Sequence, residues 1–106
     1  MKQEILDKNP IDKNGNPEGG VSMSTGVDVI WQNGPLLDGT SRLEPNGAFV
    51  ETVIEIAKKR LEFYQTTKYK CMENQEAIKK LNEALDCLDR RTNNRVKRGV
   101  EGQHII

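Results

Sequence analysis

Residues from about 69 to 98 carry a row of side chains spaced three and four positions apart, and this spacing constrains the fold more than any other feature. The row consists of Cys71, Asn74, Ile78, Leu81, Leu85 and Leu88. Such a period places the row on one face of an α-helix, and Gly99 supplies a stop. The chain is therefore expected to contain one long amphipathic helix.

A second amphipathic helix is predicted before it, from about 48 to 66. Its apolar face comprises Val50, Val53, Ile54, Ala57, Leu61 and Tyr64, and charged residues cover the other face. Pro45 blocks an earlier start, and Asn46 is available as the N-cap. Only a short break at residues 66 to 68 separates the two helices, so we expect them to form an antiparallel hairpin.

The part of the chain before residue 45 has β character. Residues 21 to 44 contain short alternating runs interrupted at Gly26 and by tight turns, which predicts a small hairpin or meander. Residues 1 to 20 are rich in turn and breaker pairs and are expected to form a flexible arm or at most one loose hairpin. The expected fold class is α+β, a small N-terminal antiparallel β-sheet followed by a long antiparallel two-helix hairpin, with residues 21 to 106 as a single domain and 99 to 106 as its tail.

The composition favours a small protein that buries apolar surface against further copies of itself. The chain has 106 residues, of which 35% are hydrophobic and 30% charged, so its core is modest. We expect a homo-oligomer, a dimer or a dimer of dimers. Sixteen Lys and Arg balance sixteen Asp and Glu, so no overall basic field attracts the chain to nucleic acid or to an anionic membrane.

Cys71 and Cys87 lie sixteen positions apart in one predicted helix, too far apart for an intrachain disulfide. We expect both to be buried as small apolar residues. No apolar run approaches the ~20 residues of a transmembrane helix, and the first residues do not begin a signal peptide. The expected location is the cytosol.

The end of the second helix carries the strongest functional signal. Residues 90 to 98 hold five cations and no carboxylate. Steps of three and four from Leu88 reach Arg91, Thr92, Arg95 and Arg98, and the forked guanidiniums of the three arginines suit one phosphate or diphosphate. The alternative is that they only complement the helix dipole, at roughly 0.3 to 1 kcal/mol each. Their predicted position on the buried stripe favours a bound anion, because lone buried charges are costly.

Asn74 is the other polar residue of the row, and its ordinary role is an interhelical hydrogen bond. It lies ~30 Å from Arg95 along one helix, so the two cannot share a small ligand within one subunit. In an antiparallel two-fold pair, Asn74 of one copy approaches Arg91 and Arg95 of the other. Phe63 and Tyr64 end the first helix and are expected either to line that pocket and stack a nucleobase or to pack in the core.

Signals for catalysis are weak. His104 is the only histidine and lies in the C-terminal tail. No Gly-rich phosphate loop precedes a helix, and no set of Cys, His and carboxylate residues has metal-ligand spacing. We therefore expect no enzymatic activity, no metal and no cofactor.

Four segments together resemble a known family. They are residues 31–36 (WQNGPL), 44–51 (EPNGAFVE), 60–65 (RLEFYQ), and Arg90-Arg91-Thr92 followed by Arg95, Arg98-Gly99-Val100-Glu101-Gly102 and His104. In this order they are similar to the phage Thoeris anti-defence family, type one. The similarity extends over about residues 21 to 106.

The resemblance implies a phage or prophage protein that inhibits Thoeris immunity, in which a TIR-domain enzyme makes a cyclic ADP-ribose isomer that activates an NAD-depleting effector. Members act as sponges in the host bacterial cytoplasm, binding glycocyclic ADP-ribose without cleaving it. Some relatives form higher assemblies and capture cyclic oligonucleotides of CBASS immunity at separate sites. The resemblance implies Asn74, Arg91 and Arg95 as ligand contacts, with Phe63 or Tyr64 stacking on adenine; residues 21 to 106 would then be a ligand-binding domain.

Other functions stay open at this point. A nucleic-acid-binding helical protein would use the same Arg-rich helix and bind any phosphate backbone with steep salt dependence, although the neutral net charge argues against it. A structural bundle protein would bind no ligand. An enzyme that cleaves the cyclic nucleotide is disfavoured, because the sequence offers no evident general acid or base.

Overall fold

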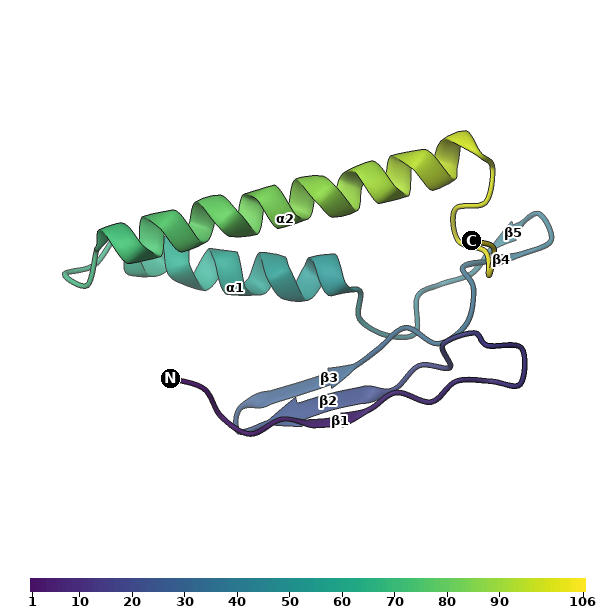
Figure 1. Cartoon of the computed structure of the whole chain (residues 1–106), viewed down its shortest axis with the longest axis horizontal. Helices are drawn as coiled ribbons and strands as arrows, with labels where there is room; N and C mark the ends of the chain where they lie inside the picture. The colour runs from purple at the N-terminus through teal and green to yellow at the C-terminus, as the bar shows by residue number, and fades with distance from the viewer. The chain divides into compact units, whose positions relative to one another are not determined.

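A computed structural model describes all 106 residues and divides them into two compact units (Figure 1). The first unit contains Met1–Phe49 and Gly102–Ile106, and the second contains Val50–Glu101. The first holds five short strands and the second holds two helices, which confirms the expected α+β class.

Three strands form an antiparallel meander in the order β1-β2-β3. They are β1 (Leu6–Lys8), β2 (Val21–Ser24) and β3 (Val27–Ile30). Ser24 pairs with Val27, so the β2–β3 connection has two residues, and the second of them, Gly26, adopts φ +79°. A left-handed residue in this turn favours glycine, which accounts for the interruption seen in the sequence.

Residues 1 to 20, expected as a flexible arm or at most one loose hairpin, supply the edge strand β1. Leu6 pairs with Met23 and Lys8 with Val21. Between β1 and β2 the chain folds back on itself at a bridge between Ile11 and Pro17. Gly20 then passes so close to β1 that a Cβ on it would lie 2.3 Å from the carbonyl oxygen of Lys8.

A separate hairpin follows the meander. It consists of β4 (Leu37–Asp38) and β5 (Ser41–Arg42), and the turn between them contains Gly39 at φ +63°. The C-terminal segment docks beside this hairpin, because the carbonyl of Gly102 accepts hydrogen bonds from the amides of Leu36 and Leu37 at 2.6 and 3.3 Å.

Two of the segments that resemble the anti-defence family bind each other. Backbone amides of Gln32 and Ala48 donate to the carbonyls of Ala48 and Ile30, and Trp31 forms a parallel bridge with Ala48. Gly47 has no room for a side chain here, since a Cβ would lie 2.5 Å from the carbonyl carbon and oxygen of Trp31. The two segments therefore meet backbone to backbone.

Asn46 belongs to this contact, so its prediction as the N-cap of the first helix is wrong. Its amide side chain exchanges two hydrogen bonds with the backbone of Asn33, and its own N–H donates to the side chain of Gln32. The helix begins later, at Val50. The backbone N–H and carbonyl of Asn33 take up the side chain that a free helix end would otherwise use as a cap.

The indole of Trp31 is anchored across the sheet. Its Nε1–H donates to Oγ of Ser22 at 2.8 Å, and that hydroxyl donates to a carboxylate oxygen of Asp7 at 2.6 Å. Asp7 lies in β1, Ser22 lies in β2 and Trp31 directly follows β3, so these two hydrogen bonds link the strands of the meander.

The second unit is a hairpin of α1 (Val50–Tyr64) and α2 (Met72–Lys97), which lie side by side (Figure 1). The two helices and their short connection are confirmed, and each helix is slightly shorter than predicted. Gln65 closes the connection by exchanging two hydrogen bonds with the backbone of Cys71 at 3.0 and 3.1 Å. Cys71 caps α2, since its Sγ accepts from the amide of Asn74 at 3.4 Å.

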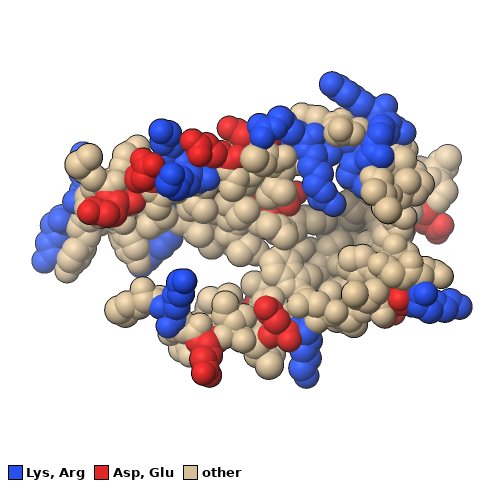
Figure 2. Space-filling view, in the orientation of Figure 1, with Lys and Arg blue, Asp and Glu red and all other residues tan.

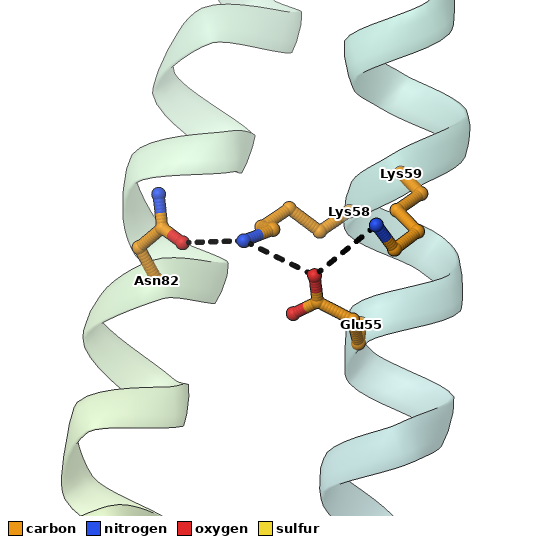
Figure 3. Close-up of polar contacts among 4 residues, drawn as sticks. All are labelled: Glu55, Lys58, Lys59 and Asn82. Atoms are coloured by element: carbon orange, nitrogen blue, oxygen red, sulfur yellow. Dashed lines mark hydrogen bonds and ion pairs between the residues drawn. The ribbon is translucent and has the colours of Figure 1, made fainter.

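A polar contact between the helices shows which of their residues lie opposite each other (Figure 3). Lys58 of α1 donates to Oδ1 of Asn82 on α2 at 3.1 Å, while Glu55 holds Lys58 and Lys59 at 3.4 and 3.8 Å. Because the helices are antiparallel, Val50 reaches about the level of residue 90. The remaining turns of α2 extend beyond α1.

The core of the helical unit is thin. Ile78 is buried, with 8% of its surface exposed, and the other residues of the stripe on α2 are half-buried. They are Asn74, Ala77, Leu81, Ala84, Leu85, Leu88, Thr92 and Arg95. The predicted stripe is thus confirmed up to Leu88. Cys87, expected to be buried, is exposed, because it lies one position off this stripe.

No helix of the chain combines the length and the apolar character needed to cross a bilayer.

Candidate functional site

The cations of α2 gather at its C-terminal end. Figure 2 shows Lys and Arg clustered over this end, whereas Lys, Arg, Asp and Glu are mixed along the earlier turns. The cluster consists of Arg90, Arg91, Arg95, Lys97 and Arg98. It lies on the turns that extend beyond the level of Val50, where no residue of α1 faces α2.

The three predicted arginines differ in burial. Arg95 is half-buried on the stripe, whereas Arg91 and Arg98 are exposed. The expectation that all three continue the buried stripe is therefore wrong. Thr92 takes the position on the stripe next to Arg91, and Arg98 caps the helix after its last regular turn.

Three guanidiniums of the cluster have hydrogen-bond partners close to their own helix. Arg95 donates from Nη2 to the carbonyl of Val100 at 3.0 Å, and Arg98 donates from Nε to Oδ1 of Asn94 at 3.0 Å. Arg90 donates to Sγ of Cys87 at 3.1 Å. The acceptors in these three bonds are neutral groups, so each bond orients a guanidinium without cancelling its charge.

The opposite end of the hairpin carries the aromatic residues. The rings of Phe63 and Tyr64 tilt at 50° with centroids 6.0 Å apart, and 51% of Phe63 is exposed whereas Tyr64 is half-buried. The central guanidinium carbon of Arg60 lies 4.9 Å from each ring centroid, and its Nε donates to the hydroxyl of Tyr64 at 3.2 Å.

Arg60 is a candidate site residue that the sequence pattern did not single out. Its positions relative to Phe63 and Tyr64, three and four residues, are those at which helical side chains meet. A cation over an aromatic face at this distance is attracted by the ring quadrupole. The spacing within residues 60 to 65 is the signal that could have identified it.

Asn74 lies at the same end as the rings, in the first turn of α2. It is half-buried, and its side-chain amide faces the carbonyl of Tyr69 at 3.5 Å. α2 is one unbroken helix from Met72 to Lys97, so Asn74 and Arg95 are ~30 Å apart. Within a single chain the candidate residues therefore fall into two separate groups, the candidate half-sites: one holds the rings and Asn74, and the other holds the arginines.

His104, the only histidine, lies in the first unit. There the pKa of Asp12 is lowered, chiefly by the backbone N–H of Asn16, with smaller contributions from the N–H of Asn14 and from the charge of His104. No three His, Cys, Asp or Glu residues cluster as metal ligands would.

Comparison with known proteins identifies a family whose members resemble this chain. The family model described as Acb2/Tad1, hairpin domain, matches residues 23–92. A protein of Bacillus phage SBSphiJ7 named "Thoeris anti-defense 1" is 41% identical over 76 residues. That similarity covers 72% of this chain and 51% of the relative, so the chain spans about half the length of the relative.

The matched segment includes both helices up to Thr92, and with them Phe63, Tyr64, Asn74 and Arg91. Arg95 and Arg98 lie beyond it. More than half of the chain matches the family model, and the relative matches over a similar share at high identity. The chain therefore belongs to the Acb2/Tad1 hairpin-domain family.

Proposed function

We propose that the chain is a phage anti-defence protein that binds glycocyclic ADP-ribose in the host bacterial cytoplasm and keeps this signal from the Thoeris effector. Family membership and the name of the phage relative support the anti-defence role. The observation that carries the choice of ligand is the pair of half-sites at the two ends of one helical hairpin: a cationic end at Arg91 and Arg95 of α2, and an end that combines the rings of α1 with Asn74 of α2.

The ligand has chemical groups that match the two half-sites. Its diphosphate suits the forked donors of Arg91 and Arg95, with Arg98 as a further cation. Its adenine suits the face of Phe63 or Tyr64, and its ribose hydroxyls suit an amide such as Asn74. No single residue has to perform chemistry in this arrangement.

Two copies of the chain complete the proposed pocket. A ligand of this size cannot reach from Asn74 to Arg95 over ~30 Å of one helix. When two hairpins pair antiparallel about a two-fold axis, the aromatic end of one lies beside the cationic end of the other, and the pocket occurs twice. The thin core of the hairpin, in which only Ile78 is buried, supports such pairing.

The proposed mechanism is equilibrium binding without turnover. A sponge lowers the free concentration of the signal in proportion to its copy number, provided that it binds more tightly than the effector does. Positioned arginines and a stacking ring are enough for this task, and no general acid, base or metal takes part.

The test is to incubate the purified chain with glycocyclic ADP-ribose, remove unbound material on a sizing column, denature the protein by heat and identify what is released. Release of the intact ligand is expected, at up to one molecule per subunit. Release of a hydrolysed product would show an enzyme. Absence of any ligand would favour a structural role.

A parallel measurement distinguishes the proposed sequestration from the alternative function, nucleic-acid binding. Single-stranded DNA and RNA are titrated into the chain at low and high salt. A nucleic-acid protein would bind them with an affinity that falls steeply as salt rises. The sponge is expected to retain glycocyclic ADP-ribose in the presence of an excess of either polymer.

A further inference from the structure

The helix α2 ends in a turn in which Val100 contacts Arg95 twice. The backbone N–H of Val100 donates to the carbonyl of Arg95 at 3.0 Å, and the carbonyl of Val100 accepts from Nη2 of the Arg95 side chain at 3.0 Å. One residue of the turn thus binds both the backbone and the guanidinium of the same arginine.

The turn is a complete helix-ending motif. Together with the bond from Val100 to Arg95, the N–H of Gly99 donates to the carbonyl of Val96 at 3.0 Å. This pair of bonds is the Schellman arrangement, which requires a left-handed residue between the helix cap and the last donor. Gly99 fills that position with φ +73°.

Such turns frequently include an apolar contact between the residue after the glycine and the residue three positions before the cap, which are Val100 and Arg95 here. In this chain a hydrogen bond from a guanidinium joins the same two positions. The acceptor is a neutral carbonyl, so this bond orients the Arg95 guanidinium and does not itself neutralise its positive charge.

We infer that Gly99 and Val100 form a positioning element for the proposed diphosphate site, by holding the Arg95 guanidinium in a fixed orientation before the ligand arrives. The inference rests on the proposed function for its purpose, and on the two bonds between Arg95 and Val100 for its geometry. A long side chain that is already ordered loses less freedom on binding, which strengthens the complex.

The hydrogen bonds described for Arg98 and Arg90 differ from the bond between Arg95 and Val100 in the kind of acceptor. Arg98 and Arg90 each donate to a side chain of their own helix, Asn94 and Cys87 respectively, and both arginines are exposed. The half-buried Arg95 instead donates to the backbone of the turn, whose geometry depends on one glycine. A change at Gly99 should therefore act on the site through Arg95.

The variant Gly99→Ala tests the inference, because alanine disfavours a positive φ. A Cβ at position 99 has no atom within 4 Å, so the change strains the backbone without a clash. Gly15→Ala is the matched control: its φ is +81°, its Cβ position is equally empty, and it lies in a loop of the first unit. Gly99→Asn serves as the rescue, since asparagine tolerates the left-handed region.

Affinity for glycocyclic ADP-ribose is measured by calorimetry for all variants, alone and combined with Arg95→Ala. We expect Gly99→Ala to weaken binding by roughly tenfold, the effect of one hydrogen bond to a charged group. Gly99→Asn should recover most of this loss and Gly15→Ala should have none. In the Arg95→Ala background, Gly99→Ala should have no further effect. Equal losses in both backgrounds would show that the turn acts on the helix end in general and would overturn the inference.

A readout without ligand keeps the inference separate from the proposed function. The mobility of the Arg95 guanidinium is measured by ¹⁵N relaxation of its Nε–H in the free protein. Gly99→Ala is expected to increase this mobility, whereas Gly15→Ala should not. If the wild-type guanidinium of Arg95 is as mobile as that of the exposed Arg91, the positioning role is wrong. If it is ordered but the wild type binds no glycocyclic ADP-ribose, the proposed function alone fails.

Discussion

Asn33 and Asn46 bind each other at two points: the N–H of Asn33 donates to Oδ1 of Asn46 at 2.8 Å, and Nδ2 of Asn46 donates to the carbonyl of Asn33 at 2.7 Å. The side chain of one residue thus pairs with the backbone of the other as a second strand would. This contact joins two segments of the chain and holds the backbone just ahead of α1.

Asn46→Ala is expected to destabilise the protein by about 1 to 2 kcal/mol, because it removes two hydrogen bonds and leaves two backbone groups with solvent as their partner. Thermal unfolding followed by circular dichroism measures this change. Asn9→Ala is the control, since the exposed side chain of Asn9 makes no such pair. Equal midpoints for the two variants would contradict the role given to Asn46.

Gly47→Ala should be more damaging than replacement of a glycine in open space. A Cβ on Gly47 meets backbone atoms of Trp31 and Gln32 at 2.5 to 2.7 Å, and backbone cannot move aside as a flexible side chain can. We expect a loss of about 3 kcal/mol, the upper part of the range for overpacking. Gly34→Ala, with φ +87° and no neighbour within 4 Å, should cost only about 1 to 2 kcal/mol. The comparison is made by chemical denaturation, and a smaller loss for Gly47→Ala than for Gly34→Ala would disprove the close approach.

Separate replacement of the two rings should identify the one that stacks on the base. Of Phe63→Leu and Tyr64→Leu, one is expected to weaken ligand binding by about 1 to 3 kcal/mol, the usual contribution of a base stacked on an aromatic residue. The other should change binding by less than about 0.5 kcal/mol. Tyr69→Leu is the control, because Tyr69 is 69% exposed in the connection between the helices. If calorimetry finds the same ligand affinity for both ring variants as for the wild type, the aromatic half-site is not part of the pocket.

Mixed dimers test whether the pocket spans two subunits. Neither Asn74→Ala nor Arg95→Ala alone should bind ligand well. A heterodimer of the two, isolated with two different affinity tags, combines an intact Asn74 from one copy with an intact Arg95 from the other in one of its two pockets. Equilibrium dialysis should therefore find one ligand per heterodimer. A heterodimer that forms but stays inactive would rule out the cross-subunit arrangement.

The lowered pKa of Asp12 predicts that the stability of the fold depends on pH. The backbone N–H groups of Asn16 and Asn14 stabilise its carboxylate, and the pKa of Asp12 in the folded chain lies below its usual value of 3.8. The contribution is therefore present above pH 3.8 and is lost as the pH falls through the lowered pKa. Asp12→Asn removes it, so the difference in unfolding free energy between wild type and variant should narrow below pH 3.8. A difference that stays constant on acidification would argue against these bonds.

The elements could be predicted from the sequence because their signals are local. The stripe from Asn74 to Leu88 repeats with the period of a helix, and the five cations between residues 90 and 98 are a property of composition. The separation of Asn74 from Arg95 follows from helical rise alone, so the division into two half-sites is already contained in the sequence.

Only the tertiary structure decided how separate segments share their partners. Asn46 has the right residue type for a helix cap, but its side chain bonds the backbone N–H and carbonyl of Asn33 instead. Likewise, helical periodicity assigned Arg91, Arg95 and Arg98 together to the buried stripe, yet in the fold Arg95 is half-buried whereas Arg91 and Arg98 are exposed. The physical reason is the same in each case: a pattern along the chain shows which groups need a partner, whereas the fold determines which partner reaches them.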